Sequence, residues 1–163
     1  MIEDMKRFRN IFIRLAAILS IAVSCQKTEP VSVQAIPDEL AAAWHLLEIS
    51  AEGNIISEGL DCYFQINTDG TFELYQKSGT QSVRYDLFTG TCTYTDGVLS
   101  GVYGNGHPWG GKYHATLSGN TLILSSYNLL ETQKYEKKAI PEDVRKNANM
   151  ITRSGTEFSK PIL

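Results

Sequence analysis

The sequence has no excess of positive charge, and this excludes two large classes of partner. Its 163 residues include 15 Lys and Arg against 18 Asp and Glu, a net charge of −3. Nucleic-acid binding depends on Lys and Arg that neutralise phosphates, and polybasic attraction to anionic lipid needs the same residues. We therefore expect no nucleic-acid partner and no attachment to a membrane through basic residues.

The sequence also lacks a catalytic or metal-binding motif. Its three histidines, His45, His107 and His114, fall on different elements and have no metal-ligand spacing. No base is placed to activate a cysteine nucleophile, and the glycines of 104–111 do not precede the helix start that a phosphate-binding loop needs. These absences predict a protein that is not an enzyme and that carries no metal or cofactor.

No apolar run is long enough to span a bilayer, and the one near the N-terminus indicates secretion instead. Leu15–Val23 is far shorter than the roughly 20 residues of a membrane-spanning helix, and basic residues precede it. Such a leader, ending in small residues, is typical of a signal peptide. Cys25 follows these small residues directly and resembles the lipidated cysteine of a bacterial lipobox. The alternative is an ordinary signal peptide with a chance cysteine nearby.

Cleavage before Cys25 defines three segments: a signal peptide at 1–24, a lipidated cysteine with its tether at 25–35, and one domain at 36–163. The mature chain keeps 11 basic and 16 acidic residues, a net charge of −5. Acyl chains on Cys25 would then hold the protein in the cell envelope, as an outer-membrane lipoprotein of a Gram-negative bacterium. Gln26–Glu29 partly resembles the signal that sends some of these lipoproteins to the cell surface; a plain solvated tether is the alternative.

The domain predicts an all-β fold. Short β-prone runs recur at roughly 8–12-residue spacing, separated by turn residues, which favours a sandwich or a closed up-and-down barrel. Short helices are expected at both ends, over 36–43 and 141–146, where proline or acidic residues begin the segment. The eight runs are Trp44–Ser50, Cys62–Asn67, Thr71–Lys77, Val83–Tyr94, Val98–Tyr103, Lys112–Leu117, Thr121–Tyr127 and Leu130–Lys137.

Turn chemistry sets two hairpin registers. A three-residue loop at Thr68–Gly70 and a two-residue loop at Gly119–Asn120 each place the flanking apolar residues on one face. At Thr95–Gly97 both registers leave apolar residues on each face, so the choice stays open. The inward-facing set that follows, which would line a ligand cavity, is Phe64, Ile66, Phe72, Leu74, Tyr113, Leu117, Leu122 and Leu124.

The cysteines and tryptophans give further expectations. With Cys25 lipidated, Cys62 and Cys92 form an even pair in an oxidising compartment, which predicts a disulfide. Trp44 opens the first strand, where an exposed indole would waste its apolar area, so we expect it in the core. Trp109 lies in a glycine-rich loop and either contacts a partner or folds back to cap the core.

Taken together, these residues resemble the lipocalin-like (calycin-type) lipoproteins of Gram-negative gut anaerobes. The resemblance covers about residues 40–146. It implies an eight-stranded antiparallel barrel, an N-terminal lipid anchor, a floor packed by the first tryptophan and, as in lipocalins proper, an apolar ligand inside. The segments that carry it are Trp44, Asn67–Phe72, Tyr103–Trp109 with Tyr113, Ser118–Leu122 and Ile140–Val144.

Two functions remain open at this level. In the first, a lipid-anchored, non-enzymatic barrel binds a small apolar or amphipathic molecule. In the second, the barrel is filled and its loops act as a protein-interaction or inhibitor module. A cavity of several hundred Å³ favours the first, and a packed interior with an exposed Trp109 favours the second. The oligomeric state is not indicated by the sequence.

Overall fold

The computed structural model describes residues 35–79, 82–128, 130–151 and 160–163. The predicted signal peptide, Cys25 and all but the last residue of the tether lie outside the described residues. Within the described part of the chain, no helix is both long and apolar enough to cross a membrane.

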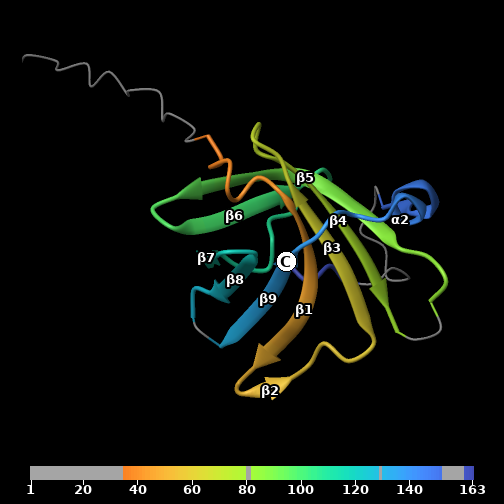
Figure 1. Cartoon of the computed structure of the whole chain (residues 1–163), viewed down its shortest axis with the longest axis horizontal. Coiled ribbons are helices and arrows are strands. Elements are labelled where there is room, and N and C mark those ends of the chain that lie inside the picture. The colour runs from red at the N-terminus through yellow and green to blue at the C-terminus, as the bar shows by residue number, and fades with distance from the viewer. Residues whose placement is uncertain (1–34, 80–81, 129, 152–159) are drawn as a thin grey trace, which may run out of the picture. The chain divides into compact units, whose positions relative to one another are not determined.

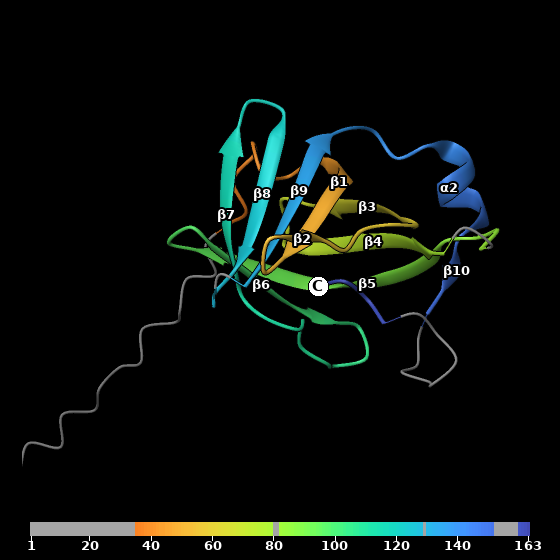
Figure 2. The same ribbon diagram turned by 90° about the horizontal axis from the view of Figure 1, so that it is seen from below.

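Eight antiparallel strands form a closed barrel, seen in Figures 1 and 2. Each strand pairs with the next in sequence, and the last pairs back with the first, so the up-and-down barrel rather than the sandwich is confirmed. The barrel strands are β1 (Ala43–Ala51), β3 (Leu60–Ile66), β4 (Thr71–Ser78), β5 (Asp86–Thr95), β6 (Val98–Tyr103), β7 (Tyr113–Ser118), β8 (Thr121–Ser126) and β9 (Glu131–Lys137).

Three short elements complete the described domain. β2 (Asn54–Ile55) pairs with β1, and β10 (Asn149–Met150) runs parallel to β5. α2 (Glu142–Asn147) follows Pro141 and has acidic residues in its first turn and basic ones in its last, as predicted. Its Val144 packs on the outer face of β3 and β4 with Tyr63 and Tyr75.

The helix predicted over 36–43 is wrong. The chain there makes a single turn, in which the Pro37 carbonyl accepts hydrogen bonds from the amides of Leu40 and Ala41, both at 2.9 Å. β1 begins at Ala43 and takes the end of the predicted segment into the sheet, so the chain there is limited to this one turn. The turn instead buries Ile36 and Leu40 against the end of the barrel.

Both predicted registers are confirmed. The Asn67 amide donates to the Thr71 carbonyl at 2.9 Å across the three-residue loop, with Gly70 at φ 80°. Ser118 pairs with Thr121 across the two-residue loop at Gly119–Asn120. The register left open by the sequence is also a two-residue loop. Asp96 and Gly97 both have positive φ, 52° and 81°, and join Thr95 to Val98, which matches the twist of the flanking strands.

One end of the barrel is closed by a packed aromatic core. Trp44 is fully buried there, and its indole N–H donates to the Leu40 carbonyl at 3.1 Å. Phe64 is the cross-strand partner of both Trp44 and Leu74, so these three side chains share the inner face. The predicted role of Trp44 in the floor of the barrel is therefore confirmed.

Trp109 lies in the core, and not on an exposed loop. It is 4% exposed and makes edge-to-face contacts with Phe64 and Phe72, with ring centroids 5.8 and 5.2 Å apart. Its indole lies on Gly101, where a side chain would occupy the same space. Of the two expectations for Trp109, the one in which the loop folds back on the core is confirmed, and the partner contact is not available to a buried ring.

Cys62 and Cys92 are free thiols, so the predicted disulfide is wrong. Both point into the core, but β4 separates their strands. Cys62 pairs with Gln76, which pairs with Asp86, and Cys92 lies six residues further along β5. At ~3.3 Å per residue that is about 20 Å along the strand, far beyond the 4.4–6.8 Å between the Cα atoms of a disulfide.

Candidate functional site

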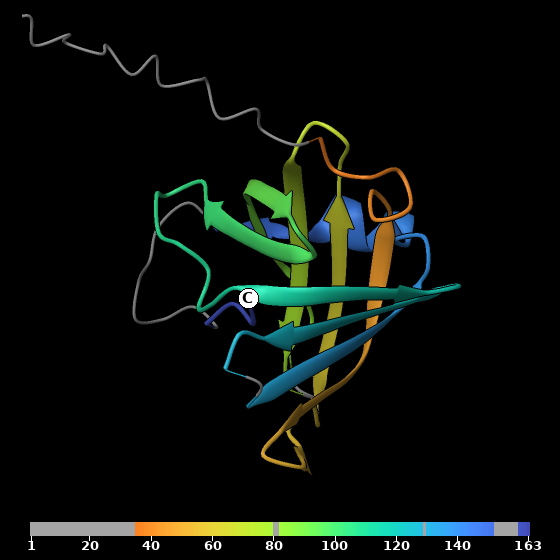
Figure 3. The same ribbon diagram turned by 90° about the vertical axis from the view of Figure 1, so that its left-hand side faces the viewer.

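The end of the barrel opposite Trp44 opens into a cleft of about 1270 Å³. Its rim is made by the loops that follow β1, β6 and β8, and its wall by the ends of those strands together with Phe88 of β5. Figure 3 shows β7, β8 and β9 side by side on one side of the barrel, and β9 pairs with β1. The closed, aromatic half of the barrel thus supports an open half that can admit a molecule.

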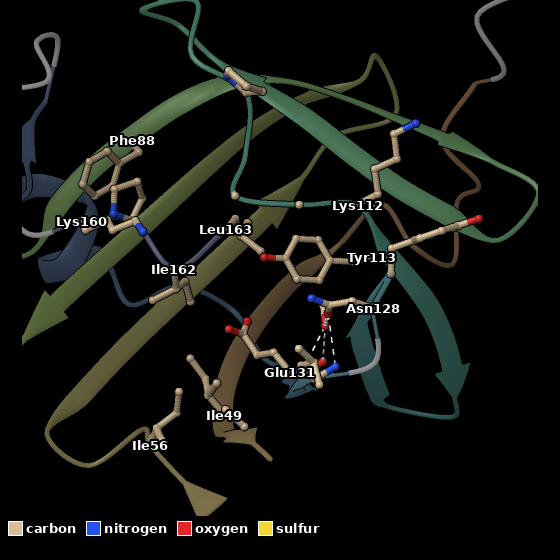
Figure 4. A pocket seen from close by; sticks show the side chains of 18 of the residues that line it. Ile49, Ile56, Phe88, Lys112, Tyr113, Asn128, Glu131, Lys160, Ile162 and Leu163 are labelled. Atoms are coloured by element: carbon tan, nitrogen blue, oxygen red, sulfur yellow. Dashed lines mark hydrogen bonds between the residues drawn. The ribbon is translucent and has the colours of Figure 1, made fainter. Parts of the chain in front are cut away.

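The inner wall of the cleft is apolar. A bulge in β1 between Leu46 and Glu48 shifts the alternation of side chains by one residue. As a result, Ile49 and Ala51 point into the barrel. Figure 4 shows Ile49, Ile56, Phe88 and Tyr113 around the same space. Such a surface gains free energy by covering apolar groups of a ligand, at about 25 cal/mol per Å² before ordering costs.

Apolar side chains also gather at the mouth. Ile56, Tyr127 and Leu130 line the cleft and are more than half exposed, at 55%, 67% and 54%. Ile55 on β2 directly precedes Ile56 in sequence and is exposed as well. Exposed apolar side chains that gather at an opening in this way are typical of a surface that contacts a ligand or a partner.

The polar groups of the cleft are mostly neutral hydrogen-bond donors. Burial and the charge of Glu131 raise the pKa of Tyr113 to about 12, and burial raises the pKa of Tyr103 further. Both phenols therefore keep their protons at neutral pH. The Tyr103 hydroxyl donates to the Leu163 oxygen at 2.7 Å, and the Tyr113 hydroxyl can donate to a ligand oxygen. Lys112, His107 and Glu131 bring groups of both signs to the rim.

The thiols of the core are not activated. Burial raises the pKa of Cys62 well above its ordinary value, and burial together with the Asp69 charge raises that of Cys92 to about 11. A thiol in this state is a poor nucleophile. The described residues contain no cluster of His, Cys, Asp or Glu that could hold a metal ion.

The structure places the predicted ligand set on the inner face, but most of it lies below the cleft. Seven of the eight residues are buried core residues, and Leu117 packs against them with partial exposure. Only Tyr113 also lines the cleft. The other seven fill the closed half of the barrel and do not line the cleft, which corrects the predicted ligand set. They are Phe64, Ile66, Phe72, Leu74, Leu117, Leu122 and Leu124.

Two functional candidates escaped the sequence analysis. Gln76 and Gln133 are the buried polar side chains of the interior, at 2% and 0% exposure. Their signal was present: Gln76 continues the inward alternation of Phe72 and Leu74 on β4, where a polar residue should not appear without a partner. Their partners lie in the segment 160–163, which no local pattern connects with the barrel.

A second polar cluster lies on the outer surface of the barrel and has a structural role. His45 Nε2 is 3.0 Å from Asp61 Oδ1, and His45 Nδ1 is 3.3 Å from Glu136 Oε1, so one imidazole links β3, β1 and β9. Burial alone would raise the pKa of Asp61, but hydrogen bonds from Tyr85 and His45 lower it on balance. None of these residues lines the cleft.

The described domain is lipocalin-like, because its eight antiparallel strands follow sequence order and close through the first and the last. No family model matches the chain, and no curated protein matches it. Two solved structures are similar, both at 13% identity. Lipoprotein YedD from Klebsiella pneumoniae superposes with a TM-score of 0.45, and the aligned region covers 69% of this chain and 83% of the YedD chain. Apo lipid binding protein 8 from Caenorhabditis elegans superposes with a TM-score of 0.36, and the aligned region covers 64% of this chain and 99% of that protein's chain.

Proposed function

We propose that this protein is a lipid-anchored, non-enzymatic carrier or receptor that holds a small apolar or amphipathic molecule in the open half of its barrel. The cleft carries this proposal. Its volume of about 1270 Å³ accommodates a ligand of the size that fills typical pockets of ~300–1,000 Å³. Its lining combines apolar walls with a few neutral donors, a composition that recognises an apolar body with a polar end.

The features that separate the two functions both favour ligand binding. A filled barrel acting through its loops would have a packed interior and an exposed Trp109. This barrel has an open cleft, and Trp109 is buried.

Blocking the mouth is expected to abolish ligand binding without unfolding the barrel. Ala51 lines the cleft at the end of β1, and its neighbour Ser50 faces the other side of the strand. With a dansylated fatty acid as probe, Ala51→Trp should lower affinity at least about ten-fold, because the indole occupies the space of the acyl chain. Ser50→Trp is the matched control and should bind like the wild type. Unchanged binding by Ala51→Trp, with an intact fold by circular dichroism, would contradict the cleft as the site.

Leu122, one of the predicted inward-facing residues, is not a position at which the site can be blocked. It is fully buried in the closed half of the barrel opposite Tyr135. A tryptophan there would disturb core packing and lower stability instead. Ala51 is the better position, because it faces open volume.

Anchoring is tested separately at the predicted lipidation site. The basic leader and the small residues before Cys25 support cleavage and acylation at this cysteine, in the outer membrane of a Gram-negative cell. Cys25→Ala should move the protein from the membrane fraction to the soluble fraction of cells. A variant that still sediments with membranes after a high-salt wash would show that another contact holds it.

A further inference from the structure

The inner end of the cleft is occupied by the chain's own residues 160–163. Leu163 is 3% exposed and belongs to the barrel core, and Ile162 packs against it. Figure 4 shows Ile162 and Leu163 in the space between Phe88 and Tyr113. This segment lies where the apolar part of a deeply bound ligand would go.

Side chains of the barrel hold this segment through its main chain. Gln76 Nε2 donates to the Lys160 carbonyl at 2.9 Å, and the Ile162 amide donates to Gln76 Oε1 at 3.0 Å. Gln133 Nε2 donates to the Ile162 carbonyl at 3.0 Å, and Tyr103 Oη donates to the Leu163 carbonyl oxygen at 2.7 Å. Three of the four bonds use peptide atoms of Lys160 and Ile162, so the two glutamines contact main-chain amide groups rather than particular side chains.

The two glutamines are arranged for this task. Each divides its amide N–H groups between the segment and a residue of its own strand, Ser78 for Gln76 and Glu131 for Gln133, at 3.0 and 2.7 Å. The Gln133 carbonyl oxygen accepts from the Tyr135 hydroxyl. Unpaired, these buried amide groups would be costly to stability, and residues 160–163 supply partners for them.

We propose that this inner wall is a subsite for apolar ligands that carry an amide, of the N-acyl amino acid class, and that residues 160–163 are its internal occupant, displaced when such a ligand binds. The proposal rests on the proposed function and names the ligand class. An N-acyl amino acid can donate its amide N–H to Gln76 Oε1 and offer a carboxylate oxygen of the same amino acid to Gln76 Nε2, with an acyl chain in place of Ile162 and Leu163. A fatty acid carboxylate accepts hydrogen bonds but has no N–H to satisfy Gln76 Oε1.

Competition with an internal occupant lowers the apparent affinity by the fraction of molecules in which the inner site is free. Removing the occupant should therefore strengthen binding. In calorimetry with the full chain and with a chain lacking residues 160–163, N-palmitoylglycine should bind the shortened chain at least about ten-fold more tightly. Palmitic acid should gain less. Equal affinity of N-palmitoylglycine for the two chains would overturn the proposal.

The glutamine supplies the matched control for the amide preference. In the chain lacking 160–163, Gln76→Leu should remove the advantage of N-palmitoylglycine over palmitic acid while both still bind. A preference that survives this substitution would overturn the role of Gln76. Should the shortened chain fail to fold, the full chain with Ile162→Asp and Leu163→Asp takes its place, because two carboxylates cannot stay in the apolar core.

Hydrogen exchange on the unaltered chain gives a direct reading. The Ile162 amide, bonded to Gln76, should be protected in the free protein and should lose protection when N-palmitoylglycine saturates it. Binding with protection retained would contradict displacement.

A third measurement separates this proposal from the proposed function: the peptide acetyl-Lys-Pro-Ile-Leu should bind the shortened chain but not the full one. If the peptide binds but no lipid does, the inner subsite stands and the lipid carrier falls. If lipids bind both chains equally and the peptide binds neither, the subsite falls alone.

Discussion

Trp44→Ala is expected to lower the free energy of unfolding by about 3–5 kcal/mol, the range for truncating a buried aromatic side chain. Trp44 has no exposed surface and closes the barrel floor, where the turn at Leu40 covers it. Its removal leaves a cavity that cannot collapse, because its neighbours on β3 and β4 are fixed by strand pairing on both sides. Urea unfolding followed by circular dichroism measures the change.

Two further variants show where this energy comes from. Trp44→Phe keeps much of the buried apolar area but loses the hydrogen bond to the Leu40 carbonyl, so it should cost less than the alanine. Val83→Ala, at a side chain that is 94% exposed, should leave stability within about 0.5 kcal/mol. A loss below about 1 kcal/mol for Trp44→Ala would show that the floor of the barrel is not packed as described.

The sequence predicts the barrel well because the evidence for it is local. Strand alternation and turn residues act over a few positions, and one buried face is enough to fix two hairpin registers. The register of the hairpin at Asp96–Gly97 could not be predicted, because hydrophobic patterning did not distinguish the two possible registers. In the structure both loop residues have positive φ, which gives the two-residue loop. Patterning therefore predicts a register only where the two faces of a strand differ clearly.

The candidate site could not be predicted to the same degree, because it depends on how deep in the barrel each inward residue lies. Alternation places Leu122 and Tyr113 on the same inner face, but it does not indicate which of the two side chains lines the open cleft. The disulfide failed for a related reason: both cysteines face inward, but at different heights and with a strand between them. Gln76 gave a usable signal as a polar residue at an inward position, but its partner is 86 residues away in sequence, at Ile162.

A glycine inside a strand is another feature whose partner the sequence does not reveal. Glycine in a strand interior marks a bulge or a close approach of another backbone, and Gly90 is the second case. A Cβ at this position would lie 2.1 Å from the Val102 carbonyl oxygen and 2.8 Å from both Tyr103 Cα and a ring carbon of Phe72. Gly90 pairs with Tyr103, so the obstacle is the backbone of β6 itself.

Gly90→Ala is therefore expected to destabilise the barrel by about 3 kcal/mol or more, at or above the upper end of overpacking effects, because β5 and β6 must move apart. Gly111→Ala is the matched control. A Cβ there meets nothing within 4 Å, and its backbone is in a region open to other residues, so stability should not change beyond about 0.5 kcal/mol. Gly101→Ala tests a second close approach, to a side chain rather than to a backbone. Its Cβ would lie 2.3 Å from the Trp109 ring, which is buried against Phe64 and Phe72, so this substitution should also destabilise the barrel. If Gly90→Ala unfolds at the same urea concentration as Gly111→Ala, the close approach of β5 and β6 is not what holds this part of the barrel together.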